Sequence, residues 1–146
     1  MDGCCEQLKL SNQLCYPIYL CSKEVVRRYN SVLSGLDLTY TQYIVMMYLW
    51  EHRSSNVSEL GEGLMLDPST LTPLLKKLEA KGYISRERSP EDERSLIISL
   101  TEKGERLSQD AASVPEQMKS CFGLSDEEGA VLYTLICKVI ANIGKE

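Results

Sequence analysis

The apolar positions of residues 67–82 repeat at the spacing of an amphipathic helix. One face of that helix carries Leu71, Leu74, Leu75 and Leu78. Asp67 suits the N-cap position, Pro68 the first helical position, and Gly82 the C-terminal stop. The opposite face and its flank carry mainly small polar and basic side chains: Ser69, Thr70, Thr72, Pro73, Lys76 and Lys77. The pattern predicts a helix that buries its leucines and presents hydrogen-bonding groups and positive charge to solvent.

Two strand-like runs, residues 83–86 and 96–100, follow this helix around a charged turn at 89–94. A short helix is predicted before it, at 58–65, with a tight turn at Leu66 and Asp67 between the two helices. Helix, turn, helix and hairpin in this order are typical of a winged helix-turn-helix reader of DNA. An ordinary amphipathic helix followed by a hairpin would give the same pattern, and the pattern alone leaves both interpretations open.

Longer apolar stripes flank this segment on both sides. They predict a helix over residues 13–34, a second over about 102–121 that is bent near Pro115, and a last one that begins at a Ser125–Glu128 capping box. A helix over 40–52 begins at a Thr39–Gln42 capping box, and residues 54–56 are expected to form a loop.

The flanking helices have more apolar surface than one small winged domain can cover. A two-fold homodimer would bury this surface and present two DNA-reading helices. The alternative is a monomer whose helices fold over its own back. We therefore expect a mainly α (α+β) fold, a winged helix-turn-helix with long N- and C-terminal dimerisation helices. A single domain is expected over 1–146, with dimerisation helices at about 13–34 and 102–146 and the DNA-binding lobe at about 39–101.

The charge distribution favours a local rather than a general nucleic-acid site. The whole chain has a net charge of −5, which argues against non-specific binding by its entire surface. Residues 68–90, however, hold five Lys or Arg against two Glu. No apolar run approaches the roughly 20 residues of a membrane span, and no signal-peptide pattern begins the chain. We expect a cytoplasmic protein without a membrane partner.

Six cysteines are present, none of them in a CxxC pair, and His52 is the only histidine. A metal site therefore has little support, no cofactor is expected, and a disulfide framework is not expected. Cys15 stands out because Pro17 is tolerated only in the first turn of a helix or at a kink, which places Cys15 at or within one turn of a helix N-terminus. The partial positive charge there stabilises a thiolate. A reactive Cys15 and a buried core thiol both remain open, and most of the other cysteines are expected to be small buried hydrophobes.

With these elements placed, the chain resembles the MarR family of dimeric winged helix repressors over nearly its whole length. Asp92-Glu93-Arg94 matches the family's Asp-x-Arg wing signature and is followed by a strand and by residues 100–104, LTEKG. Residues 12–16, 38–43, 49–51 and 66–73 are similar to the OhrR branch, which senses organic hydroperoxides. The resemblance implies double-stranded operator DNA and a second copy as partners, an organic hydroperoxide as effector, and a regulator rather than an enzyme.

In that branch a cysteine is oxidised and tyrosines hydrogen-bond its sulfur. The matching positions here are Cys15, Tyr29 and Tyr40, with Tyr19 nearby. Tyr19 lies four residues after Cys15 and shares its helix face. Tyr29 lies fourteen residues after Cys15, about 21 Å along a continuous helix. A contact between Cys15 and Tyr29 must therefore cross the dimer interface.

The family has one subclass that relies on low-molecular-weight thiols or overoxidation, and another with a resolving cysteine from the partner's C-terminal region. Cys121 lies near the position of that second cysteine, Cys137 is the fallback, and Cys4 or Cys5 could resolve from the N-terminal tail. An apolar vestibule would favour organic peroxides, with four candidates for its lining: Ile18, Met46, Met47 and Leu49.

Toward DNA, the candidates for major-groove or adjacent phosphate contacts are Ser69, Thr70, Thr72 and Lys76. Arg94 is expected to enter the minor groove, with Asp92 orienting its guanidinium. Arg86, Arg88 and Lys77 are expected to meet mostly phosphates. Two alternatives stay open: a MarR-type repressor released by a small phenolic or lipophilic ligand, and a thiol peroxidase in which the helix and hairpin are structural.

Overall fold

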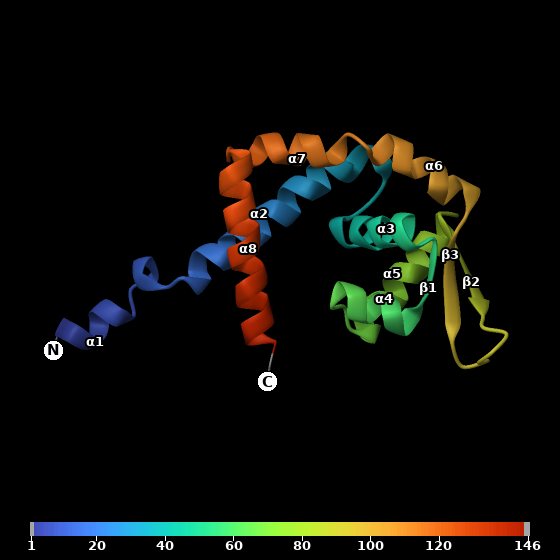
Figure 1. Ribbon diagram of the computed structural model, residues 1–146, viewed down its shortest axis with the longest axis horizontal. Helices are drawn as coiled ribbons and strands as arrows, with labels where there is room; N and C mark the ends of the chain where they lie inside the picture. The colour runs from blue at the N-terminus through green and yellow to red at the C-terminus, as the bar shows by residue number, and fades with distance from the viewer. Residues whose placement is uncertain (1, 145–146) are drawn as a thin grey trace. The chain divides into compact units, whose positions relative to one another are not determined.

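The computed structural model describes the backbone of residues 2–144 and the side chains of residues 5–144. It divides into two compact units, one ending at Ala112 and the other beginning at Ser113 (Figure 1). The first unit contains α1 (Asp2–Gln7), η1 (Leu10–Asn12), α2 (Cys15–Leu33), η2 (Ser34–Leu36), α3 (Tyr40–His52), β1 (Ser54–Asn56), α4 (Val57–Leu64), α5 (Pro68–Ala80), β2 (Ile84–Arg88), β3 (Leu96–Leu100) and α6 (Glu102–Ala111). The second contains α7 (Val114–Phe122) and α8 (Asp126–Ile143). Among the described helices, none is long and apolar enough to cross a membrane.

Capping boxes set the starts of three helices. Thr39 and Gln42 form the predicted box at α3: the Gln42 N–H donates to Thr39 Oγ1 at 3.3 Å, and the Thr39 N–H donates to Gln42 Oε1 at 3.1 Å. The predicted box of Ser125 and Glu128 at α8 is also confirmed. A third box starts α4, where Asn56 is the N-cap, and this one was not predicted from the sequence.

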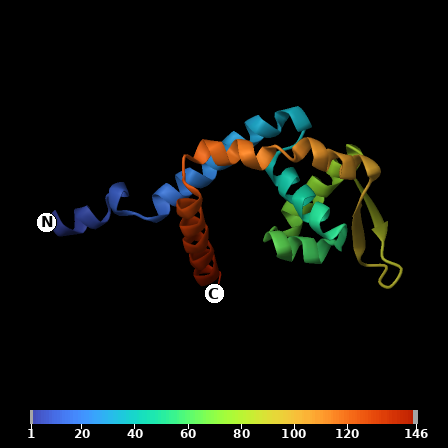
Figure 2. The ribbon, with the colours of Figure 1, turned by 45° about the horizontal axis from the view of Figure 1, so that its top comes forward.

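The three strands form one antiparallel sheet in the order β1-β3-β2. Ile98, at the centre of β3, is fully buried and faces Ser55 of β1 on one side and Arg86 of β2 on the other. The expectation of a loop at 54–56 was wrong, because these polar residues join the sheet through their backbone rather than through an apolar pattern. The loop between β2 and β3 projects as the tip of the hairpin (Figure 2).

The leucine face of α5 forms the centre of the core, as predicted. Leu71, Leu74, Leu75 and Leu78 are each at most 7% exposed. Around them α3, α4 and the sheet contribute further fully buried side chains: Val45, Met46, Leu49, Leu60, Ile84 and Ile98. Met46 and Leu49 therefore belong to this core. The expectation that these two side chains line a vestibule for the peroxide was wrong.

The end of α5 is a left-handed cap at Gly82. Gly82 has φ +77°, the Gly82 N–H donates to Glu79 O at 2.8 Å, and the Tyr83 N–H donates to Leu78 O at 3.1 Å. Tyr83 therefore closes the helix, and β2 begins one residue later than predicted, at Ile84, and extends to Arg88.

The segment predicted as one bent helix over 102–121 is two helices, α6 and α7. Pro115 is the second residue of α7. Proline has no N–H to donate and fits the first turn of a helix, so a new helix begins where a bend was expected. In the second unit α8 has no buried residue, and it exposes six large apolar side chains: Val131, Leu132, Tyr133, Leu135, Ile140 and Ile143.

Candidate functional site

The N-terminus of α5 is fixed by Asp67. Its Oδ1 accepts hydrogen bonds from the Thr70 N–H at 2.9 Å and from the Ser69 hydroxyl, and its Oδ2 accepts one from Thr70 Oγ1 at 3.1 Å. These hydrogen bonds, the one from the Ser69 hydroxyl first, lower the pKa of Asp67 to about 2. Ser69 and Thr70 are exposed and held in place by the cap, with hydroxyl oxygens still able to accept a further hydrogen bond.

The exposed face of α5 continues through Thr72, Lys76 and Lys77, and the helix is uninterrupted at Pro73. A cleft of about 670 Å³ lies between α4, α5 and the wing. Thr72 of α5 and both Asp92 and Arg94 of the wing loop line it. The fold thus brings the predicted reading helix and the predicted wing arginine to the same cleft, although they are 22 residues apart in sequence.

The wing loop is braced from within. Arg88 Nη1 donates to Glu93 O at 2.9 Å, and Asp92 Oδ1 accepts from the Arg94 N–H at 3.0 Å. The observed contact between Asp92 and Arg94 is therefore through the backbone, and orientation of the Arg94 guanidinium by Asp92 stays a prediction. Arg94 itself is exposed.

Arg86 has a partner that the sequence did not indicate. Its Nε and Nη2 both donate to Glu79 Oε2, at 2.8 and 2.6 Å, and its side chain is only 21% exposed. This ion pair ties β2 of the wing to α5. Arg86 thus has a structural role. Its contact with a DNA phosphate stays a prediction, and in that contact the guanidinium would have to bind Glu79 and the phosphate at the same time.

Cys15 is the first residue of α2 and is exposed, as is Pro17 in the same turn. The N-cap residue Leu14 makes no side-chain cap. In the first turn the Tyr16 N–H donates to Gln13 O at 3.3 Å and Pro17 has no N–H, so it is mainly the positive end of the helix dipole that favours a thiolate at Cys15. The alternative of a buried core thiol does not hold in the described chain. The other described cysteines, Cys5, Cys21, Cys121 and Cys137, are exposed as well, so the expectation that most are buried was wrong. The side chain of Cys4 lies outside the described residues.

A cluster of aromatic rings connects the C-terminal half of α2 with α3. The Tyr29 ring lies 4.5 Å from the Tyr40 ring and 5.9 Å from the Tyr43 ring. Burial raises the pKa of each of these three phenols, so at neutral pH all three are protonated and can donate a hydrogen bond. Tyr43, which is 2% exposed and contacts the edge of the Trp50 ring, was not among the predicted residues.

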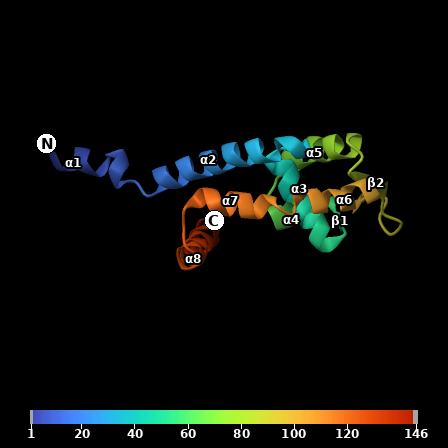
Figure 3. The ribbon, with the colours of Figure 1, turned by 90° about the horizontal axis from the view of Figure 1, so that it is seen from above.

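The distance along α2 separates these phenols from Cys15 of the same chain. α2 is one unbroken helix from Cys15 to Leu33 (Figure 3). Tyr29 therefore lies about 21 Å along the axis from Cys15. Tyr19 is on the Cys15 side, 58% exposed, with the Lys23 ammonium 5.2 Å from its ring centroid. Cys121 and Cys137 lie on α7 and α8 of the second unit.

The helix-turn-helix of α4 and α5, the three-stranded wing, and the cleft shared by Thr72 and Arg94 define a winged helix DNA-binding protein. Comparison with known proteins supports the same class: residues 27–111 match the family model described as transcriptional regulator SarA/Rot. The chain belongs to the MarR/SarA family of transcriptional regulators, which confirms the resemblance deduced from its wing and N-terminal motifs.

Relatives support this assignment over nearly the full length. The chain is 43% identical to an organic hydroperoxide resistance transcriptional regulator of Bacillus subtilis, over 93% of this chain and 95% of the relative. It is 38% identical to reduced AbfR bound to DNA, with a TM-score of 0.76 over 94% of this chain and 97% of that one. AbfR is a Staphylococcus epidermidis protein that has also been solved overoxidized and bound to DNA, and in a disulfide form. An Escherichia coli MarR mutant complexed with operator DNA is 28% identical, with a TM-score of 0.76 over 87% of this chain and 93% of that one. These relatives are regulators and not enzymes, as the sequence predicted.

Proposed function

We propose that this chain is a redox-sensing repressor that binds operator DNA as a homodimer and releases it when Cys15 is oxidised by an organic hydroperoxide. The observation that carries the proposal is Cys15 itself: an exposed thiol at the first residue of a long helix whose first turn has no side-chain cap. The name of the Bacillus subtilis relative, which refers to organic hydroperoxide resistance, gives the class of effector. Its site of action is the cytoplasm, where operator DNA lies.

The chemistry begins at the Cys15 thiolate, which attacks the distal oxygen of the hydroperoxide. An S–O bond forms and the O–O bond breaks, so sulfur is oxidised by two electrons while the peroxide leaves as an alcohol after protonation. A second thiol then attacks the sulfenate sulfur, an S–S bond forms, and the oxygen leaves as water. This thiol is Cys121 or Cys137 of the partner subunit, or a low-molecular-weight thiol.

The separation within α2 supports a dimeric sensor. Tyr29 and Tyr40 are neutral donors suited to a thiolate or sulfenate, but they are too far from Cys15 of their own chain to reach it. A second copy would bring its Cys15 to this pair. The exposed apolar face of α8 gives such a dimer surface to bury.

Disulfide formation is the proposed releasing step, because a bond that joins two elements constrains their positions more than oxidation of one sulfur does. Among the relatives of this chain, AbfR has been solved in an overoxidized form bound to DNA and in a disulfide form. A disulfide requires the two Cα atoms within about 7 Å, so its formation constrains how the helices of the dimer can lie.

On DNA, the proposed contacts of the reading helix are Ser69, Thr70, Thr72 and Lys76, with Lys77 and Arg88 at phosphates and Arg94 in the minor groove. All seven side chains are exposed, and the cap at Asp67 holds the first two in place before DNA binds.

Replacement of single cysteines tests the proposal. We expect Cys15→Ser to bind operator DNA but to stay bound after treatment with cumene hydroperoxide. Cys21→Ser is the matched control, because Cys21 is exposed on the same helix but lies more than a turn beyond its start. It should be released like the wild type. Release of Cys15→Ser by the peroxide would contradict the proposal and favour another sensor residue or a ligand-gated repressor.

A further inference from the structure

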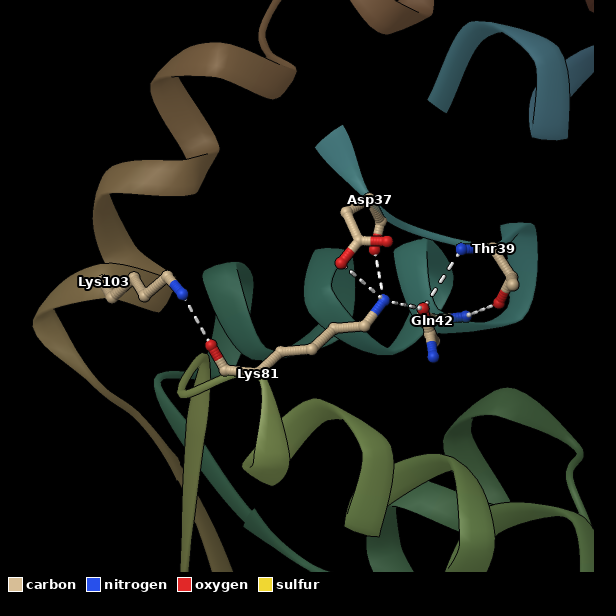
Figure 4. Close-up of polar contacts among 5 residues, drawn as sticks. All are labelled: Asp37, Thr39, Gln42, Lys81 and Lys103. Carbon is tan, nitrogen blue, oxygen red and sulfur yellow. Dashed lines mark hydrogen bonds and ion pairs between the residues drawn. The ribbon is translucent and has the colours of Figure 1, made fainter. Parts of the chain in front are cut away.

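Lys81 lies at the C-terminal end of the reading helix α5 and extends toward the segment that joins α2 to α3 (Figure 4). Its ammonium donates to the Asp37 backbone oxygen, lies 3.2 Å from Asp37 Oδ2, and donates to Gln42 Oε1 at 3.3 Å. A lysine ammonium has three N–H donors, and here three oxygens receive them. The side chain is 27% exposed. This is a long-range polar contact between residues 39 to 44 positions apart in the chain.

The acceptors of Lys81 are themselves fixed. Gln42 is 4% exposed, and its Oε1 also receives the Thr39 N–H at 3.1 Å in the capping box of α3. It cannot turn away from Lys81 without opening that box. Asp37 has φ +52°, a left-handed conformation that few residues other than glycine adopt and in which Asp is enriched. Gln42 is thus the buried acceptor held by the capping box, whereas the Asp37 carboxylate is 81% exposed and reaches Lys81 from a left-handed turn.

The same short segment carries one of the two sensor tyrosines. Tyr40 is the first residue of α3, between Thr39 and Gln42. Its N–H donates to Asn30 Oδ1 of α2 at 2.8 Å, and its ring contacts Tyr29 of α2. A shift of Tyr40 relative to α2 consequently moves the backbone that bears the Lys81 acceptors.

The main chain at Lys81 is held from the opposite side. Lys103, in the first turn of α6, donates from its Nζ to Lys81 O at 2.7 Å (Figure 4). The Thr101 hydroxyl donates to Gly82 O at 2.6 Å. The end of α5 is thus held by its side chain to the α2–α3 segment and by its backbone to the junction of the wing and α6.

We propose that Lys81 is the positioning residue through which a change at the Tyr29–Tyr40 pair reaches the reading helix. The proposal rests on the proposed redox function. When the sulfur at the tyrosine pair enters a disulfide, the phenols lose their charged acceptor and Tyr40 changes place. Residues 37–42 move with it, and Lys81 follows because leaving three oxygens would deprive a partly buried ammonium of its acceptors. α5 is displaced, and its contacts with the operator weaken.

Lys81→Met tests this role, because methionine keeps an unbranched apolar stem and removes all three donors. Three quantities are measured: the rate of Cys15 oxidation by cumene hydroperoxide, and the operator Kd of the reduced and of the oxidised protein. We expect an unchanged oxidation rate and a ratio of oxidised to reduced Kd that is at least about tenfold smaller than in the wild type, within the usual range of coupling between two sites. Arg106→Met is the matched control. It also removes one positive charge and one ion pair, but from the exposed face of α6, and its ratio should equal that of the wild type.

A Lys81→Met ratio equal to that of the wild type overturns the inference. If that variant does not fold, Lys81→Gln takes its place, because glutamine keeps an unbranched polar side chain but is uncharged and one atom too short to reach the Asp37 and Gln42 oxygens. The ratio of oxidised to reduced operator Kd must also fall in this variant, and an unchanged ratio would equally overturn the proposed role of Lys81. A wild-type protein that keeps its operator affinity after oxidation refutes the proposed function and the inference with it. If oxidation releases the operator from the wild type and from the Lys81 variants to the same extent, the inference about Lys81 is refuted and the proposed function stands.

Discussion

The Arg86 guanidinium donates twice to one oxygen of Glu79, at 2.8 and 2.6 Å, and so joins the second strand of the wing to the reading helix. Both side chains are partly shielded, 21% and 38% exposed, so water screens the pair only in part. α5 and β2 are also joined by the apolar core beneath them and by the Gly82 turn. The Arg86–Glu79 pair adds a polar contact on their outer side and so helps to fix the orientation of the wing relative to α5.

We therefore expect Arg86→Met to lower the free energy of unfolding by about 1–2 kcal/mol, the range of a charge-assisted hydrogen bond that is not fully buried. Arg88→Met is the control: Arg88 is exposed and donates to Glu93 O only, and its loss should change stability by less than about 0.5 kcal/mol. Urea unfolding of the two variants decides the matter. Equal stabilities would mean that the Glu79 pair contributes nothing beyond a surface contact.

Gly104 is required by a close approach of two backbones. A Cβ at this position would lie 2.0 Å from the backbone oxygen of Tyr83, and the Gly104 carbonyl accepts the indole N–H of Trp50 at 2.9 Å. Gly104→Ala must displace β3–α6 from Tyr83, at a cost of about 3 kcal/mol. Thermal unfolding followed by the fluorescence of Trp50 measures this directly. Gly35→Ala, where the added Cβ meets nothing within 4 Å, should unfold close to the wild type, and a similar loss in both variants would contradict the steric explanation.

Arg94 and Lys77 should differ in what they contribute to operator binding. Arg94→Ala is expected to weaken binding by about 1–3 kcal/mol if its guanidinium enters the minor groove, and to do so most on the specific sequence. Lys77→Ala should weaken binding to all sequences alike and reduce the salt dependence of log K by about one unit. Binding titrations at several salt concentrations separate the two. A uniform loss for Arg94→Ala would place Arg94 at a phosphate instead.

Asp67 predicts a pH dependence of stability. Its pKa is about 2 in the folded chain, mainly because the Ser69 hydroxyl and the Thr70 N–H donate to the carboxylate, against an ordinary value of 3.8. A lowered folded-state pKa stabilises the fold above pH 3.8, and this contribution disappears as the pH falls through 2. Asp67→Asn keeps a good N-cap without the titration.

The variant should therefore lose less stability than the wild type between pH 4 and pH 2. Urea unfolding across that interval provides the comparison. Parallel losses in the two proteins would show that the cap does not prefer the ionised form.

The parts of the fold that could be predicted are those encoded by neighbouring residues. The start of α3 follows from the Thr39–Gln42 box, and the buried face of α5 follows from its leucine spacing. β1 could not be predicted, because Ser54–Asn56 have no strand pattern and pair only through β3, more than forty residues away. Met46 and Leu49 were misplaced since apolar character does not distinguish a core from a vestibule.

In the candidate site, too, some features follow from neighbouring residues and others depend on tertiary contacts. The position of Cys15 follows from Pro17 and helix geometry, and the separation of Cys15 from Tyr29 follows from counting residues. The Arg86–Glu79 pair and the three acceptors of Lys81 depend on tertiary contacts that no local pattern indicates. Tyr43 was missed for a similar reason: its place beside Tyr29 results from the packing of α3 on α2.

The central claim is that oxidation of Cys15 releases the operator. The most direct measurement adds cumene hydroperoxide in steps to the protein–operator complex and follows, in the same samples, the bound fraction and the modification of each cysteine by non-reducing mass spectrometry. We expect release to rise in proportion to modified Cys15, and the Cys15 peptide to appear cross-linked to Cys121, Cys137 or a small thiol. Complete release with Cys15 still a free thiol, or full retention of DNA with Cys15 in a disulfide, would contradict the account.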